Sequence, residues 1–329
     1  MLVKGWFKNI KLAAIVAAIF VHGSIFAEPM SSGYDLVTGM TNASKSLSYA
    51  GLVTYEYRGN LRSIKVAHIV RDGKTYERIQ HMDGPESEVV RRGDDTDCMR
   101  AADLLLGGRP LKSGDDNYAH LRDLYDFHIR GDARIAGRSV SVVHVIPKDR
   151  FRYGYIVAID KQSGLMLQSV LMNHDSKPME RFQFIDVAIG ASANNVEWLP
   201  SLMTSGGAEE SVCQQDNTPP SPSAWESRWR PPGFVLSSYS PDDPDGRESM
   251  MYTDGLAVFS VFIDASESSQ SLPGVEANVG ATVVVLRKAK FNNRQYAVTV
   301  VGEIPRSTAS RIAVAMGPIR RLPTKSLNE

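Results

Sequence analysis

Apolar and polar residues alternate with a period of two along most of the chain, a pattern typical of β-strands. In residues 52–57, Val53, Tyr55 and Tyr57 fall on one side of a pleat. The same pattern predicts strands over residues 64–70, 76–82, 86–91, 96–100, 125–131, 139–147, 153–159, 165–174 and 179–189. Ahead of them, three- and four-residue apolar spacing predicts a helix in residues 34–49. A short helix is also expected near residues 118–125. Together these elements predict one large, curved antiparallel sheet.

A second, smaller unit is predicted after a break in the pattern. Residues 201–230 are rich in Pro, Gly and Ser, which resist helix and sheet, so we interpret them as a linker. A long functional loop of a single domain is the alternative. Beyond residue 231, alternation predicts strands over residues 234–239, 248–253, 256–264, 281–287 and 295–302, with a helix over 305–316. Asp254-Gly255 is a strong two-residue hairpin signal between two of these strands.

The first residues follow the basic, apolar, small-residue order of a secretory signal peptide. Lys4, Lys8 and Lys11 precede or border an apolar run at residues 12–21, and cleavage is expected after Ala27. This run is shorter than the ~20 residues that span a bilayer, although an uncleaved membrane anchor is the alternative. A short signal on a cysteine-poor chain favours export to a bacterial periplasm.

Charge and cysteine content narrow the classes of function. The 329 residues include 37 basic and 37 acidic ones, and removal of residues 1–27 leaves 34 basic residues and a net charge of −3. This balance gives no electrostatic footprint for nucleic acid. The two cysteines, Cys98 and Cys213, cannot form a disulfide-dense scaffold or a four-thiolate zinc site. Whether they form one disulfide or remain separate thiols is open at this level.

Sequence motifs for catalysis are absent. The chain carries no nucleophile-elbow, zinc-protease, phosphate-loop or dinucleotide-binding motif. Histidines such as His68 and His144 lie within alternating strands, where packing or surface roles are the ordinary outcome. We therefore expect a protein that is not an enzyme, with no catalytic residue, no metal site and no cofactor.

The apolar positions that share one face of the large sheet are the most informative feature. If helices fill the concavity of the sheet, these residues form a core. If helices fill it only in part, they line a cavity for an acyl chain. Periodicity alone leaves both open. The candidates for this lipid pocket are Val53, Tyr55, Tyr57, Ile64, Val66, Val140, Val142, Ile156, Leu167, Phe182 and Phe184.

Several strings resemble the MucB/RseB family of periplasmic regulators. In the first unit the resemblance is carried by residues 44–55 (SKSLSYAGLVTY), 81–91 (HMDGPESEVVR), 136–138, 153–155 and 160–165. In the second unit it is carried by residues 231–234 (PPGF), 252–262 (YTDGLAVFSVF), 280–285 and 298–305. These strings occur in order and span nearly the whole exported chain.

The resemblance implies a fold that is mainly β with α+β character. The larger domain of the family is similar to the lipoprotein carriers LolA and LolB, a half-open antiparallel β-barrel closed by helices. The smaller α+β domain has an antiparallel sheet and a C-terminal helix. The organisation expected is a signal peptide at 1–27, a lipid-sensing domain at 28–200, the linker at 201–230 and an anti-sigma-binding domain at 231–320.

The resemblance also implies a function. The family restrains an envelope-stress sigma factor by binding the periplasmic part of an RseA- or MucA-like anti-sigma factor and shielding it from regulated proteolysis. Lipid or lipopolysaccharide fragments would weaken the complex. Arg228, Arg230 and Tyr239, near the linker, are candidate partner contacts. A periplasmic lipid or lipoprotein carrier is the alternative function, and a homodimer is left open.

Overall fold

The computed structural model describes residues 32–85, 87–92, 118–196, 223, 225–241, 247–265, 274–291 and 293–319. Predictions about the signal peptide, the strand at 96–100, most of the linker, Cys98 and Cys213 lie outside these residues. The described residues all belong to one compact unit, Ser31–Glu329. Among them, no helix is both long enough and apolar enough to cross a bilayer.

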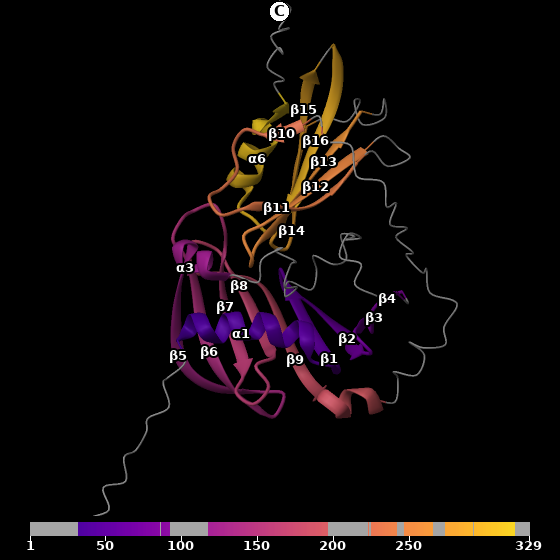
Figure 1. The fold of residues 1–329 in the computed structure, drawn as a ribbon, viewed down its shortest axis with the longest axis vertical. Helices are drawn as coiled ribbons and strands as arrows, with labels where there is room; N and C mark the ends of the chain where they lie inside the picture. The colour runs from indigo at the N-terminus through magenta and orange to yellow at the C-terminus, as the bar shows by residue number, and fades with distance from the viewer. Residues whose placement is uncertain are drawn as a thin grey trace, which may run out of the picture. The chain divides into compact units, whose positions relative to one another are not determined.

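Nine antiparallel strands form the large sheet (Figure 1). Their bounds are β1 Tyr49–Tyr57, β2 Asn60–Arg71, β3 Lys74–His81, β4 Glu88–Arg92, β5 Tyr125–Ile135, β6 Arg138–Pro147, β7 Gly154–Asp160, β8 Met166–Met172 and β9 Pro178–Ile189. They lie in the order β4-β3-β2-β1-β9-β8-β7-β6-β5. The two end strands, β4 and β5, do not pair with each other, so the sheet stays open. The predicted half-open antiparallel architecture is confirmed.

Tight hairpins and bulges shape this sheet. The loops at Arg58-Gly59, Asp72-Gly73 and Ala136-Gly137 have positive φ at both residues, as two-residue turns that follow the strand twist require. The register of β1 against β9 shifts between Leu52 and Val53, and similar shifts occur in the β5–β6, β7–β8 and β8–β9 pairs. Such bulges bend the strands and increase their twist, which gives the sheet its curvature.

One long helix, α1 Gly33–Ser46, crosses a face of the large sheet (Figure 1). It begins where Ser32 and Asp35 form a capping box, each side chain accepting a hydrogen bond from the other's backbone N–H. The Ser32 hydroxyl, and after it the Ser32 backbone N–H, donates to the Asp35 carboxylate and lowers the pKa of that group. Val37 packs the helix against the sheet within a buried apolar cluster. Short helical segments flank the last five strands: η1 Tyr118–His120, α3 Leu121–Leu124 and η2 Gly190–Asn195.

The second sheet has six antiparallel strands in the order β11-β12-β13-β16-β15-β14. Their bounds are β11 Val235–Ser240, β12 Arg247–Thr253, β13 Val258–Asp264, β14 Val275–Val279, β15 Thr282–Phe291 and β16 Arg294–Gly302. Helix α6, Arg306–Ala315, packs Ile312 against a core that includes Phe259 and Val285. The prediction of five strands missed β14, an edge strand whose residues are mostly exposed and do not alternate.

The end of the predicted linker belongs to the second unit. Strand β10, Trp225–Ser227, pairs with β17, Met316–Pro318. Trp225 is buried in the same core as Phe234 and packs edge-on against Tyr296. The assignment of residues 201–230 as linker was therefore wrong at its C-terminal end, because one large aromatic anchor outweighs the proline-rich composition around it.

Candidate functional site

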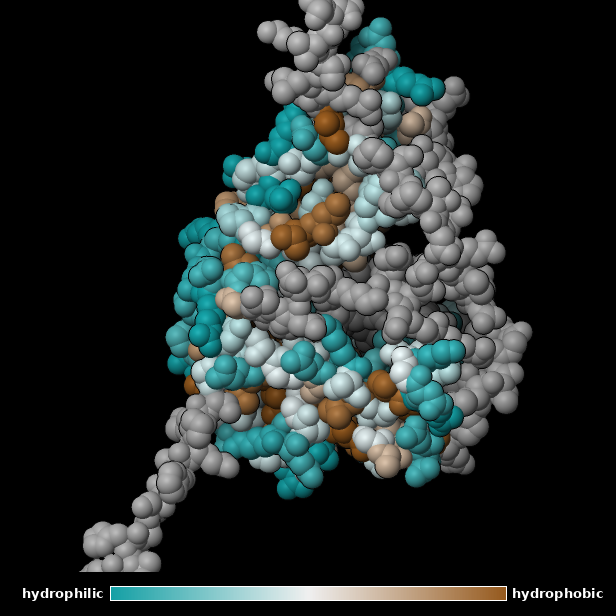
Figure 2. Space-filling model, viewed as in Figure 1, coloured by the Kyte–Doolittle hydropathy of each residue, from teal (hydrophilic) through white to brown (hydrophobic). Residues whose placement is uncertain are grey.

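A pocket opens between α1 and the large sheet. Its lining is mostly apolar: Val37 and Met40 come from α1, and Ile79, Phe182 and Phe184 come from the sheet. The cavity has a volume of about 130 Å³. Figure 2 shows hydrophobic side chains reaching the surface over the large sheet, on the face that α1 crosses. This arrangement can hold an apolar group.

Nine of the eleven predicted pocket residues lie in one apolar cluster beside this cavity. Seven are buried: Val53, Tyr55, Ile64, Val66, Val140, Leu167 and Phe184. Tyr57 and Phe182 pack against them and are partly buried. Three of the nine, Val66, Phe182 and Phe184, also line the pocket itself. The structure thus places most of the predicted face together, and much of it forms the floor behind the pocket.

Val142 and Ile156 lie on the wrong side for a pocket role. Their neighbours Val143, Val145 and Val157 pack in the cluster beneath α1. Because successive side chains of a strand point to opposite faces, Val142 and Ile156 point away from the helix, and both are partly exposed. Val140, two residues before Val142 and on the same side of β6, is nevertheless buried in the cluster that contains Val53 and Phe184.

Polar side chains at one end of the pocket are paired with one another. The His68 ring stacks on Tyr49 at 5.1 Å between centroids, and its Nδ1 lies 3.3 Å from a Glu77 carboxylate oxygen. The Arg78 guanidinium lies 2.7 Å from a Glu88 carboxylate oxygen. Within the described part of the chain, no three His, Cys, Asp or Glu residues are grouped as metal ligands. The polar groups at this end of the pocket thus pair with one another, and the rest of the lining is mostly apolar.

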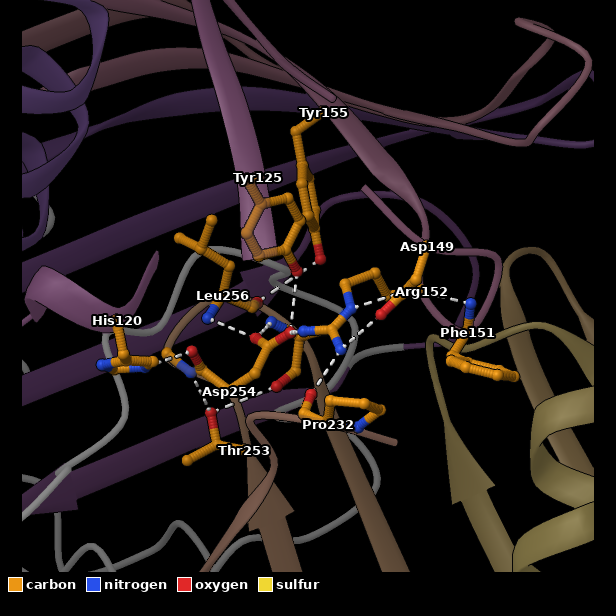
Figure 3. A network of polar contacts seen from close by, with 12 residues as sticks. His120, Tyr125, Asp149, Phe151, Arg152, Tyr155, Pro232, Thr253, Asp254 and Leu256 are labelled. Atoms are coloured by element: carbon orange, nitrogen blue, oxygen red, sulfur yellow. Dashed lines mark hydrogen bonds and ion pairs between the residues drawn. The ribbon is translucent and has the colours of Figure 1, made fainter. Parts of the chain in front are cut away.

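A buried polar network joins the large sheet to the second sheet (Figure 3). Arg152, in the loop before β7, is fully buried and forms ion pairs with Asp149, at 2.9 Å, and with Asp254. Its guanidinium also donates to the carbonyl of Pro232. The Tyr125 hydroxyl donates to Asp254 at 2.9 Å. Residues from four separate segments thus meet at one carboxylate and one guanidinium.

Electrostatics keep this network in one protonation state. Burial, with the Asp254 charge next in importance, raises the pKa of Tyr125 well above its usual value, so the hydroxyl remains a donor. Burial alone would lower the pKa of Arg152, but the interactions with Asp254, Tyr125 and Asp149 together more than offset it and the net pKa is raised. Removal of either charged partner would leave the other buried and uncompensated, which typically costs about 3–5 kcal/mol.

Asp254 also shapes the turn that it occupies. Its Oδ1 accepts hydrogen bonds from the backbone N–H groups of Leu256, at 2.9 Å, and Ala257, at 2.7 Å. The Thr253 hydroxyl accepts from Gly255 N–H, and Gly255 has φ of +98°. One carboxylate therefore fixes the β12–β13 turn with one oxygen and binds the large sheet with the other.

The turn places a side chain in the pocket. Gly255 and Leu256 line the cavity together with residues of α1 and the large sheet. Leu256 packs against the cluster that contains Val37, and its carbonyl lies 3.4 Å from the Tyr155 hydroxyl. The sequence signal identified Asp254-Gly255 as a hairpin turn, and the structure confirms the turn. Nothing local in that signal indicated that it reaches a second sheet.

Two further contacts join the sheets. The Glu180 carboxylate, on β9, accepts from the backbone N–H of Ala281. Burial, and after it the negative charge of Glu180, raises the pKa of Glu303 to about 8. Elsewhere, Phe151 packs edge-on against Trp229 at 5.3 Å between ring centroids, and the Arg311 guanidinium lies 3.7 Å above the Trp229 ring. The junction thus combines an ion network, a carboxylate pair and an aromatic stack.

The three predicted partner residues gather on the second unit. Arg228 and Arg230 are exposed on either side of Trp229, and the Arg230 Nε donates to the carbonyl of Phe234 at 2.9 Å. The Tyr239 hydroxyl, on β11, donates to Glu248 at 3.1 Å.

Comparisons with known proteins agree over nearly the whole chain. Residues 32–203 match the family model of the MucB/RseB N-terminal domain, and residues 219–317 match that of the MucB/RseB C-terminal domain. The sigma factor AlgU regulatory protein MucB of Pseudomonas aeruginosa is 33% identical over 309 residues, which cover 90% of this chain and 95% of MucB. The sigma-E factor regulatory protein RseB of Escherichia coli K12 is 28% identical over 330 residues, or 94% and 96% of the two chains.

Solved structures give the same result. The crystal structure of MucB in complex with MucA(peri) has a TM-score of 0.67 at 32% identity, and the match covers 87% of this chain and 98% of that one. The crystal structure of MucB alone has a TM-score of 0.63 at 30% identity, with the same coverage.

Proposed function

Since this chain belongs to the MucB/RseB family, we propose that it binds the periplasmic domain of a membrane anti-sigma factor and so regulates an envelope-stress sigma factor. Binding would shield the anti-sigma factor from regulated proteolysis, which keeps the sigma factor inactive. The proposal places the mature chain in the periplasm, the compartment that the predicted signal peptide also favours.

The observation that carries this proposal is the likeness to MucB in its complex with MucA(peri). The match covers 98% of that chain, so both sheets and the junction between them have counterparts in a protein that holds such a partner. A likeness restricted to the large sheet would support a carrier equally well. The second sheet is what favours a partner-binding function.

Strand β11 has the features of a binding site for an extended partner segment. It lies at the edge of the second sheet and exposes Val235 and Leu236, at 48% and 52%. The predicted contacts Arg228, Arg230 and Tyr239 lie on this strand or just before it. An extended peptide can add to a sheet edge through main-chain hydrogen bonds while side-chain pockets supply specificity. We propose that the anti-sigma factor binds along β11.

The pocket would receive the signal. Its apolar lining suits an acyl chain from a lipid or a lipopolysaccharide fragment. A ligand releases the partner only if it binds the free regulator more tightly than the complexed one. The regulator therefore needs two states that differ both at the pocket and at the partner site. The junction between the two sheets connects the pocket to the sheet that carries β11, so a change at the junction would alter both sites.

Binding to the partner tests the proposal. The mature chain is mixed with the periplasmic domain of a MucA-like anti-sigma factor, and affinity is measured by isothermal titration calorimetry. Val235→Lys together with Leu236→Lys places charges on the β11 edge and should weaken binding by more than about 1 kcal/mol. Val314→Lys, at a 75% exposed position on α6, is the matched control and should bind normally.

Protection from proteolysis is the functional readout. The bound anti-sigma domain should be cleaved more slowly than the free one, and the β11 variant should lose this protection. Failure of the unmodified chain to bind the anti-sigma domain would refute the proposed function. Normal binding of that domain by the β11 variant would refute the proposed binding site on β11.

A lipid or lipoprotein carrier remains the second candidate because the pocket itself favours it. A carrier would transfer bound lipid to an acceptor and would not need β11. Lipid transfer that is unaffected by the β11 variant, with no capture of an anti-sigma domain, would favour this function.

A further inference from the structure

The pocket of the large sheet is closed in part by the second sheet. Gly255 and Leu256 belong to the β12–β13 turn, yet they line the cavity beside Val37 and Met40 of α1. Leu256 packs in the same apolar cluster as residues of β5, β6 and β7. A side chain of the protein therefore occupies space at the pocket that a ligand would use.

The size of the cavity makes this occupancy important. Its volume is about 130 Å³. An apolar cavity of ~150 Å³ holds no more than a benzene molecule, whereas pockets for larger ligands measure ~300–1,000 Å³. A whole acyl chain does not fit within this volume. Displacement of a side chain that lines the pocket would make room for one.

The walls differ in how they are held. The sheet strands are joined by continuous backbone ladders, and α1 is anchored through buried Val37. The β12–β13 turn reaches the large sheet instead through side-chain contacts: Asp254 with Arg152, Asp254 with Tyr125, and the Asp254 carbonyl with His120 Nε2 at 2.9 Å. Withdrawal of the turn breaks a few side-chain contacts and no backbone ladder.

We propose that Leu256 is a plug that an acyl chain displaces from the pocket, and that the Arg152–Asp254 pair is the latch that holds this plug in place. The proposal rests on the lipid part of the proposed function. It adds that the ligand and the closed junction are mutually exclusive. Entry of an acyl chain would free the β12–β13 turn and loosen the second sheet, which carries β11.

Acyl-probe binding tests the plug. The mature chain is titrated with dansylundecanoic acid and followed by probe fluorescence. Leu256→Ala removes the plug and should tighten binding about fivefold, since the closed state loses the packing of a partly buried leucine. Met40→Ala enlarges the same pocket from α1 without releasing the turn, and it should change affinity less than Leu256→Ala.

A substitution at Tyr125 tests the contacts of Asp254 more specifically, because Tyr125 does not itself line the pocket. Tyr125→Phe deletes one hydrogen bond to Asp254 and keeps the ring, so the turn is held less tightly while the residues that line the pocket are unchanged. Tighter probe binding by about two- to tenfold is expected. Unchanged or weaker binding in both Tyr125→Phe and Leu256→Ala would overturn the plug, as would equal tightening in Met40→Ala and Leu256→Ala.

Hydrogen exchange locates the movement directly. Saturating lauric acid should speed amide exchange in the peptide that covers residues 253–257, where Leu256 and Ala257 N–H groups donate to Asp254. Slower exchange in this peptide would mean that the ligand seats with the turn in place, and it would overturn the proposal. Absence of probe binding would also overturn it.

The anti-sigma titration keeps the two proposals distinguishable. If the chain binds the anti-sigma domain but not the acyl probe, the proposed regulatory function stands and the proposal that Leu256 is a plug is refuted. Acyl binding that responds to Leu256 and Tyr125, without partner capture, does the reverse.

Discussion

Arg152 and Asp254, 102 residues apart in sequence, form a fully buried ion pair between the large sheet and the second sheet. Each has another task as well. Arg152 also binds Asp149 and the Pro232 carbonyl, and Asp254 also fixes its own turn. The pair therefore couples the local shape of a hairpin to the junction of two sheets.

Loss of the arginine should destabilise the chain strongly. Arg152→Met leaves Asp254 buried without its cation, and the free energy of unfolding should fall by about 3–5 kcal/mol. Urea denaturation followed by circular dichroism measures this. Arg152→Met combined with Asp254→Asn removes both charges, keeps an oxygen that accepts from the turn, and should recover part of the loss. A double variant that is less stable than Arg152→Met would contradict the account of an uncompensated charge.

Stability should depend on pH through Glu303. Burial and Glu180 raise its pKa from 4.5 to about 8, so between these values the folded chain holds a proton that the unfolded chain has released. The contribution of this group is complete below about pH 4.5 and is lost as pH rises through about 8. Glu303→Gln removes this dependence and should be more stable than the unmodified chain at about pH 9.

Urea titrations of both proteins at about pH 4, 6, 7.5 and 9 check the Glu303 prediction. Subtracting one curve from the other cancels the titration of every other group. A difference that stays constant across the series would show that Glu303 titrates with its ordinary pKa in the folded chain.

Two glycines should respond to alanine in opposite directions. Gly51, on β1, faces the backbone carbonyl of Asp186, and an added Cβ would lie 2.2 Å from that oxygen. Gly51→Ala should destabilise by about 1–3 kcal/mol or more because the β1–β9 ladder must shift. Gly39, exposed in α1, has no atom within 4 Å of the added Cβ. Gly39→Ala should stabilise by about 0.5–1 kcal/mol. Thermal unfolding of both variants decides the outcome.

Phe184 should be essential to the floor of the pocket. It is buried, packs against Phe182 and Tyr49, and also lines the cavity. Phe184→Ala should cost about 3–5 kcal/mol in the free energy of unfolding. Leu61→Ala, at a 63% exposed position on β2, should change it by no more than about 0.5 kcal/mol. A small effect of Phe184→Ala would mean that the floor can collapse into the space.

Local pattern was sufficient for most elements of the fold. Alternation located all nine strands of the large sheet near their observed positions, and Asp72-Gly73 marked a real hairpin. It failed at β14, because exposed edge residues need not alternate, and at β10, where Trp225 is recruited by a core far along the chain. It also assigned Val142 and Ile156 to the pocket, although neither lines it, because the lining is set by contacts between distant segments.

The candidate site was predictable only in part. The apolar floor followed from alternation, because a half-buried sheet has to cover one face. Arg152 lies in a polar run beside Asp149 and Arg150, where an exposed loop is the natural reading, and Asp254 has the local signature of a simple turn. What marks Arg152 and Asp254 as important is that two opposite charges are buried in contact with each other. Burial is a property of the folded chain and cannot be read from the local sequence.

The sequence by itself determined the antiparallel strands, the order of a large sheet followed by a smaller α+β part, and the family to which the chain belongs. Strand periodicity, turn residues and family sequence strings are all local features of the chain. The tertiary structure alone decided which apolar residues face the pocket, that Leu256 lines it, and that Arg152 meets Asp254. These facts depend on the register and on contacts between distant segments, which a local pattern does not encode.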